Sequence, residues 1–351
     1  MSEPAGLTKA SRILFMAAAV VVLVAGLQAA SQLILPFLVA IFVAVLSLPL
    51  LSALQRLRLP SWLAVVVTVL SVILVLVGIG VLVGGSIQDF TAAAPKYQAR
   101  LKGLAGSVDQ WFQARGVPTR EWYSKDLFDP GIAIDFINRM LRAVAAILSN
   151  TVLVLLTTVF ILLEAAGLPP KLRAALGGST AALERFAAMK SEIQNYLAIK
   201  TLVSIVTGSV IAIWLSLLGV DFPLLWGLIA FLMNYIPTLG SILAAIPPSL
   251  LALVQIGPGR AVLVALGFAV VNIILGSLIE PHLMGRKLGL SPLIVFLSLV
   301  FWGWVWGPIG MLLSVPLTMI IKIVLENSAE LRWLAILLDA GPPQEPVERD
   351  A

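Results

Sequence analysis

Long runs of hydrophobic residues without any charge dominate the chain. A helix needs about 20 apolar residues to cross a hydrocarbon core about 30 Å thick. Six charge-free runs have a suitable length, and each predicts one membrane-spanning helix: Ile13–Ala30, Leu33–Leu54, Trp62–Ile87, Val144–Leu163, Leu202–Val220 and Ala261–Ile279. The first run leads almost directly into the second, without a cleavage site and a soluble domain after it. We therefore expect it to be retained and not removed as a signal peptide.

Two further runs are too long for one straight span. Phe222–Ile256 has 35 residues and no charge, and Leu290–Val324 has 35 residues with Lys322 as its single charge. As straight helices, each would be about 52 Å long, which is well beyond the thickness of the bilayer. We expect each of these runs to tilt steeply, to break or to fold back.

The two long runs resemble each other. An opening proline, a Pro/Gly pair and a closing proline recur in the same order. The matched positions are Pro223 and Pro292, Pro237 and Pro308, Gly240 and Gly310, and Pro247 and Pro316. The two outer pairs are 69 residues apart, and the inner pairs slip by one or two residues. This recurrence predicts an internal repeat.

Proline and glycine give the repeat its physical meaning. Proline removes a backbone donor and clashes with the preceding turn, and glycine permits a reversal of the chain. We therefore predict hinges or breaks at six of these positions, Pro237, Gly240, Pro247, Pro308, Gly310 and Pro316. Paired Gly/Pro-interrupted segments in two halves of a chain are typical of transporter binding sites. The alternative is that both runs are proline-kinked, tilted helices that pack through glycine.

Two topologies remain open for these runs. If each is a re-entrant hairpin, the spans before them run in opposite directions and the repeats are inverted. Arg286 and Lys287 then lie in the cytoplasm and Arg260 lies outside. An eight-span model reverses these positions. The positive-inside rule favours the hairpins by two basic residues against one.

Composition agrees with a membrane protein. The chain is 60% hydrophobic and 12% charged with a mean hydropathy of +1.04, whereas an ordinary soluble domain is about a quarter charged. The fold class predicted is therefore an all-α polytopic membrane protein. Cysteine is absent and His282 is the single histidine, which excludes disulfide scaffolds, thiol catalysis and clustered histidine metal sites. We expect no cofactor and no metal.

Motifs and charge exclude other function classes. The sequence contains neither a phosphate-binding GxxxxGK[ST] motif nor HExxH, so we expect neither an ATP-driven pump nor an enzyme. No basic run with interleaved aromatics appears, so nucleic acid is not an expected partner. The net charge of +5 comes from basic residues next to the spans, and their distribution places the N-terminus in the cytoplasm.

This topology predicts five regions: N-terminal transmembrane helices (1–87), an extracytoplasmic amphipathic helical segment (88–142), a transmembrane helix with a cytoplasmic amphipathic linker (143–199), a transport core that contains the repeat (200–325), and a partly disordered cytoplasmic tail (326–351).

Glu280 is the most informative acidic residue. It follows the charge-free run 261–279 and precedes a proline. A carboxylate at a membrane edge could coordinate sodium, exchange a proton or bind a polyhydroxylated ligand. The alternative is an interfacial charge that pairs with Arg286 or Lys287 and fixes the turn.

Uncharged polar residues mark the first break. Asn234 precedes it, and Thr238 and Ser241 lie within it. Free carbonyls and half-helix ends there could receive a polar solute or a cation, or these side chains could bond their own backbone. Asn272 lies inside a span, where its amide either faces a cavity or bonds another helix.

Three tryptophans, Trp302, Trp304 and Trp306, precede the second break. We expect them to anchor the chain at the membrane interface. An aromatic wall for a sugar-like ligand is the alternative.

Several segments resemble the autoinducer-2 (AI-2) exporter family. They are Glu192-Ile-Gln-Asn-Tyr196 with Lys200 and Gly208, Leu218-Gly-Val-Asp-Phe-Pro223, Asn234-Tyr-Ile-Pro-Thr-Leu-Gly240, Glu280-Pro-His-Leu-Met-Gly285 and Trp304-Val-Trp-Gly-Pro-Ile-Gly310. The resemblance implies a bacterial inner-membrane, multi-pass protein that forms homo-oligomers. The activities it implies are export of AI-2 and, in other members, sodium/proton or lithium/proton antiport.

The function expected from these observations is that of a secondary transporter. It would export a small polar signalling molecule by alternating access, with the two hairpin tips meeting near the bilayer centre and Asn234, Thr238, Ser241, Asn272 and Glu280 as binding residues. Two alternatives remain: a monovalent cation/proton antiporter, and a non-transporting membrane scaffold that recruits partners through residues 88–142.

Overall fold

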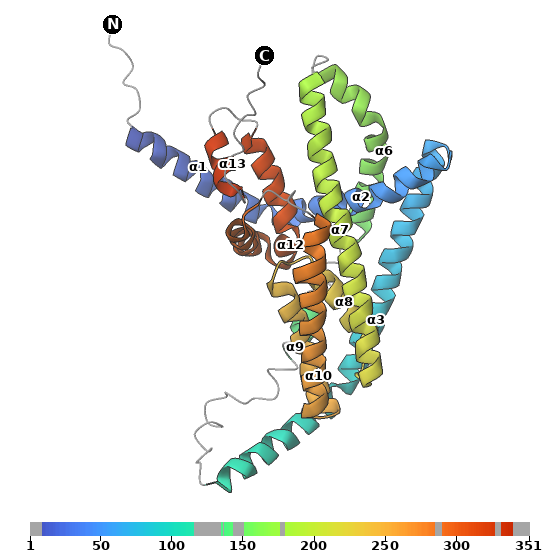
Figure 1. Ribbon diagram of the computed structural model, residues 1–351, viewed down its shortest axis with the longest axis vertical. Helices are drawn as coiled ribbons and strands as arrows, with labels where there is room; N and C mark the ends of the chain where they lie inside the picture. The colour runs from blue at the N-terminus through green and yellow to red at the C-terminus, as the bar shows by residue number, and fades with distance from the viewer. Residues whose placement is uncertain are drawn as a thin grey trace.

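The computed structural model describes residues 9–115, 135, 137–142, 151–175, 180–284, 290–326 and 331–339. These residues are helical and include no strand, as the sequence predicts (Figure 1). The helices are α1 (Lys9–Ala29), α2 (Ser31–Arg56), α3 (Ser61–Gln113), α6 (Thr151–Ala175), α7 (Thr180–Leu218), α8 (Pro223–Met233), α9 (Leu239–Gln255), α10 (Pro258–Val271), the π-helix η1 (Asn272–Ile279), α11 (Glu280–Met284), α12 (Pro292–Glu326) and α13 (Arg332–Leu338). Five helices in the described part are long and apolar enough to span a membrane.

Two predicted boundaries fall inside continuous helices. α3 runs for 53 residues, so the boundary between residues 87 and 88 lies within it, and Pro95 does not interrupt it. α7 runs for 39 residues across the boundary between residues 199 and 200. Alanine, leucine, glutamate, arginine and lysine are strong helix formers, so the amphipathic parts extend the apolar helices. Residues 116–134 and 143–150 and the tail beyond residue 339 lie outside the described residues.

The first long run folds back on itself. Both ends of the α8–α9 pair meet at the side chain of Gln255. Its amide oxygen accepts a hydrogen bond from the backbone N–H of Asp221 (3.0 Å), and its amide nitrogen donates to the carbonyl of Gly219 (3.2 Å). α8 leaves this point, and α9 returns to it after a break at residues 234–238. We call residues 223–255 the first hairpin.

The second long run also folds back. Inside α12 the backbone reverses at Gly307, whose φ is +64°. The indole N–H of Trp302 donates to the hydroxyl of Thr318 at 3.2 Å. These two residues are 16 apart, which would place them about 24 Å apart in a straight helix. We call residues 292–326 the second hairpin.

Both tips depend on a glycine. A Cβ atom added to Gly240 would overlap the carbonyl of Met233, and one added to Gly310 would overlap the carbonyl of Trp302. The chain therefore passes its own preceding helix too closely for any side chain at either position.

Two of the predicted hinges are not breaks. Pro247 lies inside α9, and Pro316 lies inside the returning arm of α12, where Gly307 is the single residue with non-helical angles. The chain reverses at the tips, so these prolines sit in helices that continue past them.

The two hairpins open at opposite ends of one helical column, which consists of α10, η1 and α11. At its start, Arg260 donates to the carbonyl of Leu218, next to the open end of the first hairpin (2.7 Å). At its other end, Met284 packs against Leu290, which directly precedes the second hairpin. The hairpins therefore have inverted orientations along the column (Figure 1).

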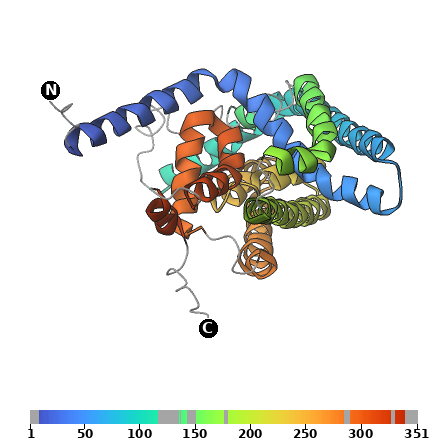
Figure 2. The same cartoon turned by 90° about the horizontal axis from the view of Figure 1, so that it is seen from above.

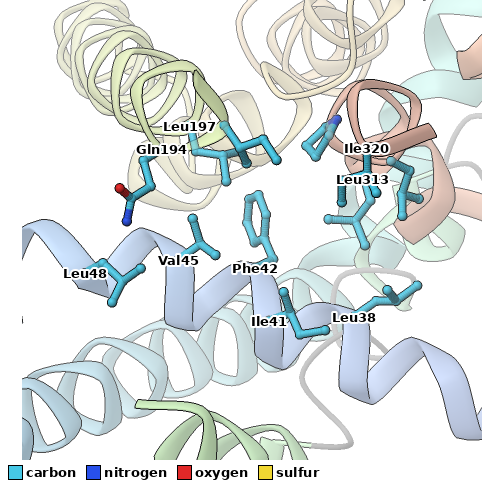
Figure 3. A pocket seen from close by; sticks show the side chains of 12 residues that line it. Leu38, Ile41, Phe42, Val45, Leu48, Gln194, Leu197, Leu313 and Ile320 are labelled. Atoms are coloured by element: carbon cyan, nitrogen blue, oxygen red, sulfur yellow. The ribbon is translucent and has the colours of Figure 1, made fainter. Parts of the chain in front are cut away.

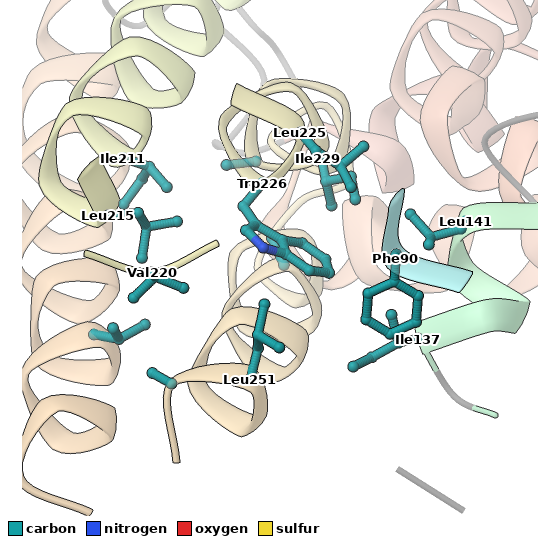
Figure 4. Close-up of a cluster of buried hydrophobic side chains, with 14 of the residues drawn as sticks. Phe90, Ile137, Leu141, Ile211, Leu215, Val220, Leu225, Trp226, Ile229 and Leu251 are labelled. Atoms are coloured by element: carbon teal, nitrogen blue, oxygen red, sulfur yellow. The ribbon is translucent and has the colours of Figure 1, made fainter. Parts of the chain in front are cut away.

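A hydrophobic cluster joins α3 to the first hairpin (Figure 4). Trp226 of α8 and Phe90 of α3 are both 0% exposed at its centre. On the other side of α8, Gly227 packs directly against Gly208 of α7, where an added Cβ would come within 2.6 Å of the facing carbonyl. By contrast, α1 extends away from the rest of the molecule (Figures 1 and 2).

Candidate functional site

A cavity of about 320 Å³ lies at the tip of the first hairpin. Its walls come from α7, from the tip itself, from the η1–α11 part of the column and from the arms of the second hairpin, which contribute Val295 and Val315. Eight of its lining residues are polar: Tyr196, Lys200, Asn234, Thr238, Ser241, Asn272, Ser277 and Glu280. A polar chamber is thus built between helices that are otherwise strongly apolar.

The structure brings all five predicted binding residues to this cavity. Asn234, Thr238 and Ser241 come from the first hairpin, Asn272 from η1 and Glu280 from α11. The hairpin tip and the column therefore supply opposite walls of one chamber.

The second tip lies elsewhere. The indole N–H of Trp306 donates to the carbonyl of Leu27 in α1 (3.0 Å), and the amide of Gln28 donates to the carbonyl of Trp304 (3.2 Å). The prediction that the two tips meet is therefore wrong. The arms of the second hairpin border the polar cavity, whereas its tip packs on α1.

Glu280 is paired within the membrane-spanning helices. Its carboxylate Oε1 lies 2.6 Å from Nζ of Lys200, and the two side chains are 14% and 7% exposed. Arg286 and Lys287, the partners considered from sequence, lie outside the described residues. Among the described residues that line the cavity, Lys200 and Glu280 are the two that carry charge, so their charges cancel.

The π-helix positions this carboxylate. η1 covers the eight residues directly before Glu280, and π-turns in otherwise α-helical segments occur frequently at functional sites. A π-turn adds a residue per turn, which rotates the following side chains relative to an α-helical continuation. Glu280 thereby follows the irregular part of the column and faces α7.

Hydrogen bonds connect α7 to the first tip. The buried amide of Asn234 donates from Nδ2 to the hydroxyl of Ser204 (2.9 Å), and the phenol of Tyr235 donates to the hydroxyl of Thr201 (2.7 Å). Thr238 instead bonds its own backbone, because its hydroxyl donates to the carbonyl of Pro237 (2.7 Å). Thr238 therefore bonds its own backbone, as one of the two interpretations expected, whereas Asn234 bonds a neighbouring helix.

The tip also stores backbone strain. Thr238 has φ +57° and ψ −50°, and the N–H of Leu239 bonds the carbonyl of Pro237 at 2.6 Å. This arrangement is a classic γ-turn, which is rare and strained for a residue with a side chain. Such a residue costs about 1–3 kcal/mol and persists only where its surroundings hold it in place.

A second, much smaller cavity adjoins the first. It has about 10 Å³, and its polar lining residues are Thr207, Asn234, Ser241 and Asn272. The hydroxyl of Thr207 is buried there and has no hydrogen-bond partner among the described residues. Asn272 lines both cavities and lies against Gly276, one turn further along η1.

Sequence reasoning did not predict Tyr196, Lys200 or Thr207 as site residues. Lys200 was named there only as part of a segment that resembles the family, and the structure places it inside α7. The available signal was periodicity. Tyr196, Lys200 and Ser204 are spaced i, i+4 and i+8, which places them on one face of a helix.

The expectation for the tryptophans is wrong at two of three positions. Trp302 and Trp306 are 6% and 7% exposed and stack on each other with ring centroids 4.8 Å apart. Trp304 is 64% exposed. The buried pair holds the second hairpin together and packs against α1, so it neither anchors at an interface nor lines the polar cavity.

Comparison with known proteins supports a role in transport. The model of the AI-2E family transporter matches residues 13–330. The AI-2 transport protein TqsA of Escherichia coli (strain K12) is 36% identical over 338 residues, which cover 96% of this chain and 98% of that protein. A Haemophilus influenzae protein is 36% identical over 334 residues, with coverage of 93% and 96%. YhhT of Escherichia coli (strain K12) is 32% identical over 332 residues, with 95% of each covered.

The last two relatives are named only provisionally as transport proteins, without a substrate. In all three, the similarity extends over nearly the whole length of both proteins. This chain therefore belongs to the AI-2E family of membrane transporters.

Proposed function

We propose that this protein is a secondary transporter that exports a small polar signalling molecule of the AI-2 type through the cavity at the first hairpin tip. The observation that carries the proposal is the buried Lys200–Glu280 pair on the wall of a polar chamber among apolar helices. Charged groups in membrane-spanning segments are costly and usually mark a substrate or ion pathway. The printed name of TqsA assigns AI-2 transport to that relative.

The cavity suits an uncharged solute that is rich in hydroxyl groups. An ammonium group provides three donors, a carboxylate provides only acceptors, and hydroxyls and amides provide both. Because the charges of Lys200 and Glu280 cancel, the chamber has no net attraction for a simple anion or cation. A polyhydroxylated molecule can replace water at each of these groups without bringing a charge of its own.

In the proposed mechanism, two re-entrant hairpins with opposite orientations would provide alternating access. With the N-terminus in the cytoplasm, the first hairpin opens outward and the second opens inward. The Lys200–Glu280 pair then joins α7 to α11 beside the first tip. Movement of the tip against this pair would expose the cavity to one side at a time, driven by the gradient of the solute or of an ion.

The setting proposed is the bacterial inner membrane, with the protein as a homo-oligomer. Along α1, Leu14, Phe15 and residues 20–23 are each more than 60% exposed. An apolar helix that extends away from its own chain suits contact with lipid or with a second subunit.

Monovalent cation/proton antiport is the second candidate, and Glu280 is the observation that favours it. A carboxylate on the wall of a membrane cavity can bind a sodium or lithium ion when ionised and a proton when neutral. The ammonium group of Lys200 and the bound cation would then pair with the Glu280 carboxylate in turn.

One experiment separates the candidates. The purified protein in proteoliposomes is tested side by side for flux of labelled AI-2 and for pH changes dependent on sodium or lithium, with wild type and Glu280→Gln. The exporter proposal expects AI-2 flux that falls at least tenfold in the variant, with no cation-dependent pH change. The antiport candidate expects a sodium- or lithium-dependent pH change that is lost in Glu280→Gln, with no AI-2 flux. The scaffold alternative is favoured if neither flux exceeds that of empty liposomes and deletion of residues 88–142 alone abolishes the cellular phenotype.

A further inference from the structure

An apolar groove lies outside the polar cavity, between α2, α7 and the returning arm of α12. It encloses about 220 Å³, and eleven of its twelve lining side chains are apolar, with Gln194 as the exception. Figure 3 shows Phe42 and Val45 of α2 facing Leu197 of α7 and Leu313 of α12 across it. The groove is therefore concave on three sides and suited to an apolar occupant.

α2 uses different faces for its packing and for the groove. Ala40, Ala44 and Leu51 are buried at 0%, 1% and 5% exposure. Ala44 and Leu51 pack with residues of α3 and α6, and the carbonyl of Ala40 accepts a hydrogen bond from Thr158 of α6. The groove residues Leu38, Ile41, Phe42 and Val45 lie on another face, and Leu48 lies at the border, because it lines the groove and also packs with this cluster.

The groove face of α2 continues into a basic end. Arg56 is 18 residues beyond Leu38, which is five full turns of an α-helix and places both on the same side. It ends α2 about 12 Å beyond Leu48. Arg56 and Arg58 are both exposed. Figure 3 places Gln194 at the Leu48 end of the groove, so its polar and basic groups gather at one end.

We propose that this groove binds one acyl chain of an anionic phospholipid, with the phosphate at Arg56 and Arg58. The chain would lie along α2 toward Leu38, with Gln194 beside the ester region of the lipid. The groove is apolar along its length and basic at one end. A phospholipid matches this distribution, because it has a long apolar part and an anionic group at one end. A guanidinium group binds phosphate through two parallel hydrogen bonds.

The head group, and not the acyl chain, determines which lipid binds more tightly. Lipid tails are as apolar as leucine, so moving a chain from the bilayer into the groove yields little free energy by itself. Each basic residue near the membrane surface favours an anionic lipid by about fivefold in affinity. We therefore expect phosphatidylglycerol to bind more tightly than phosphatidylcholine with identical chains.

The bound lipid would also contact the transport core. Leu197 lines the groove and its neighbour Tyr196 lines the polar cavity. In the same way, Pro316 faces the groove and Val315 faces the cavity. The two spaces thus share a wall made of α7 and the returning arm of α12. An acyl chain between this arm and α2 would hold that wall in place.

Native mass spectrometry of the full-length protein, titrated with phosphatidylglycerol or phosphatidylcholine of the same chain length, tests the proposal. We expect one phosphatidylglycerol per chain to bind preferentially. Arg56→Gln and Arg58→Gln should each reduce its affinity about fivefold. Lys102→Gln is the matched control, because it removes an exposed basic residue from the distant part of α3 and should leave the affinity unchanged.

A second variant tests the groove itself. Val45→Trp fills the apolar space and should remove the phosphatidylglycerol-specific binding while the thermal unfolding temperature of the protein stays within a few degrees of wild type. Equal affinity for the two lipids, or unchanged binding in Val45→Trp, would overturn the proposal. So would a change of oligomer mass in Val45→Trp with lipid binding intact, because the groove would then be a contact between subunits.

Discussion

The two hairpins use the same backbone device in different surroundings. Each starts with a proline, and each has a tip glycine whose hydrogen faces a carbonyl of the preceding helix. At the second tip the reversal occurs at Gly307, which adopts positive φ without steric cost. At the first tip the residue with positive φ is Thr238, which is strained.

The surroundings of the two tips also differ. The first tip borders a polar cavity with a buried ion pair, whereas the second is held by stacked indoles and α1. Strain and buried charge, both of which reduce stability, occur together at the first tip. Costly features that persist in one place are expected where function requires them. This difference agrees with the proposed transport role of the first tip, and the second tip would then have a supporting role.

The largest effect expected is the same in both hairpins. Gly240→Ala and Gly310→Ala each place a methyl group on a backbone carbonyl that cannot move without opening the hairpin. We expect each to destabilise the protein by at least about 3 kcal/mol. Thermal unfolding of the detergent-solubilised protein, monitored by size-exclusion chromatography, measures this loss.

Gly78→Ala is the control for both variants, because outside the neighbouring backbone of its own helix no atom lies within 4 Å of the added carbon. It should be neutral or slightly stabilising. If either tip variant unfolds at the same temperature as this control, that hairpin does not form the close turn.

The next effect separates the two hairpins. Replacing the buried pair by apolar residues of similar size, Lys200→Met with Glu280→Leu, should leave stability unchanged or raise it slightly. Glu280→Leu alone should cost about 3–5 kcal/mol, because it leaves Lys200 buried without its partner. If the pair acts in transport, the stable double variant still loses at least tenfold in AI-2 flux per folded protein.

Lys322→Met is the counterpart in the second hairpin. Lys322 lies 3.5 Å from Glu326 and 3.4 Å from Asp339, whose side chains are 47% and 43% exposed. The side chain of Lys322 itself is 10% exposed, but it does not line the polar cavity. We therefore expect the flux of this variant, per folded protein, to stay within about twofold of wild type. Equal losses of flux at both lysines would contradict the functional difference between the hairpins.

Local chemistry explains what the sequence predicts well. The breaks are predicted from Pro237, Gly240, Pro308 and Gly310 because proline and glycine constrain the backbone wherever they occur. The polar residues of the first tip follow, since a chain break in lipid needs polar partners. Pro247 and Pro316, predicted by the same rule, lie inside helices that continue past them, because a proline in a packed helix can be tolerated without ending it.

Long-range packing explains what the sequence does not predict. Lys200 and Glu280 are 80 residues apart, and no local pattern pairs them. The position of Trp306 against Leu27 spans 279 residues. Such contacts depend on how whole helices dock, so the sequence predicts the hairpins but not which tip faces the cavity.

A reciprocal exchange at the tips tests the strain. Thr238→Gly should stabilise the protein by about 1 kcal/mol, because glycine adopts the γ-turn angles freely. Gly307→Thr should destabilise it by about 2–3 kcal/mol, since φ +64° with ψ −146° is almost restricted to glycine. Thermal unfolding of both variants provides the measurement. A loss of stability in Thr238→Gly would mean that the threonine side chain contributes more than the strain costs.

The smallest effect compares two buried threonines. The hydroxyl of Thr318 accepts the indole N–H of Trp302, so Thr318→Val leaves a buried donor unpaired and should cost about 1–3 kcal/mol. The hydroxyl of Thr207 has no partner among the described residues, so Thr207→Val should be neutral or stabilising by up to about 1 kcal/mol. Both variants are measured by thermal unfolding, with AI-2 flux in parallel. If Thr207→Val is stable but transports less, its hydroxyl acts on the solute. If it is as destabilised as Thr318→Val, its hydroxyl is bonded to a water in the small cavity and has a structural role.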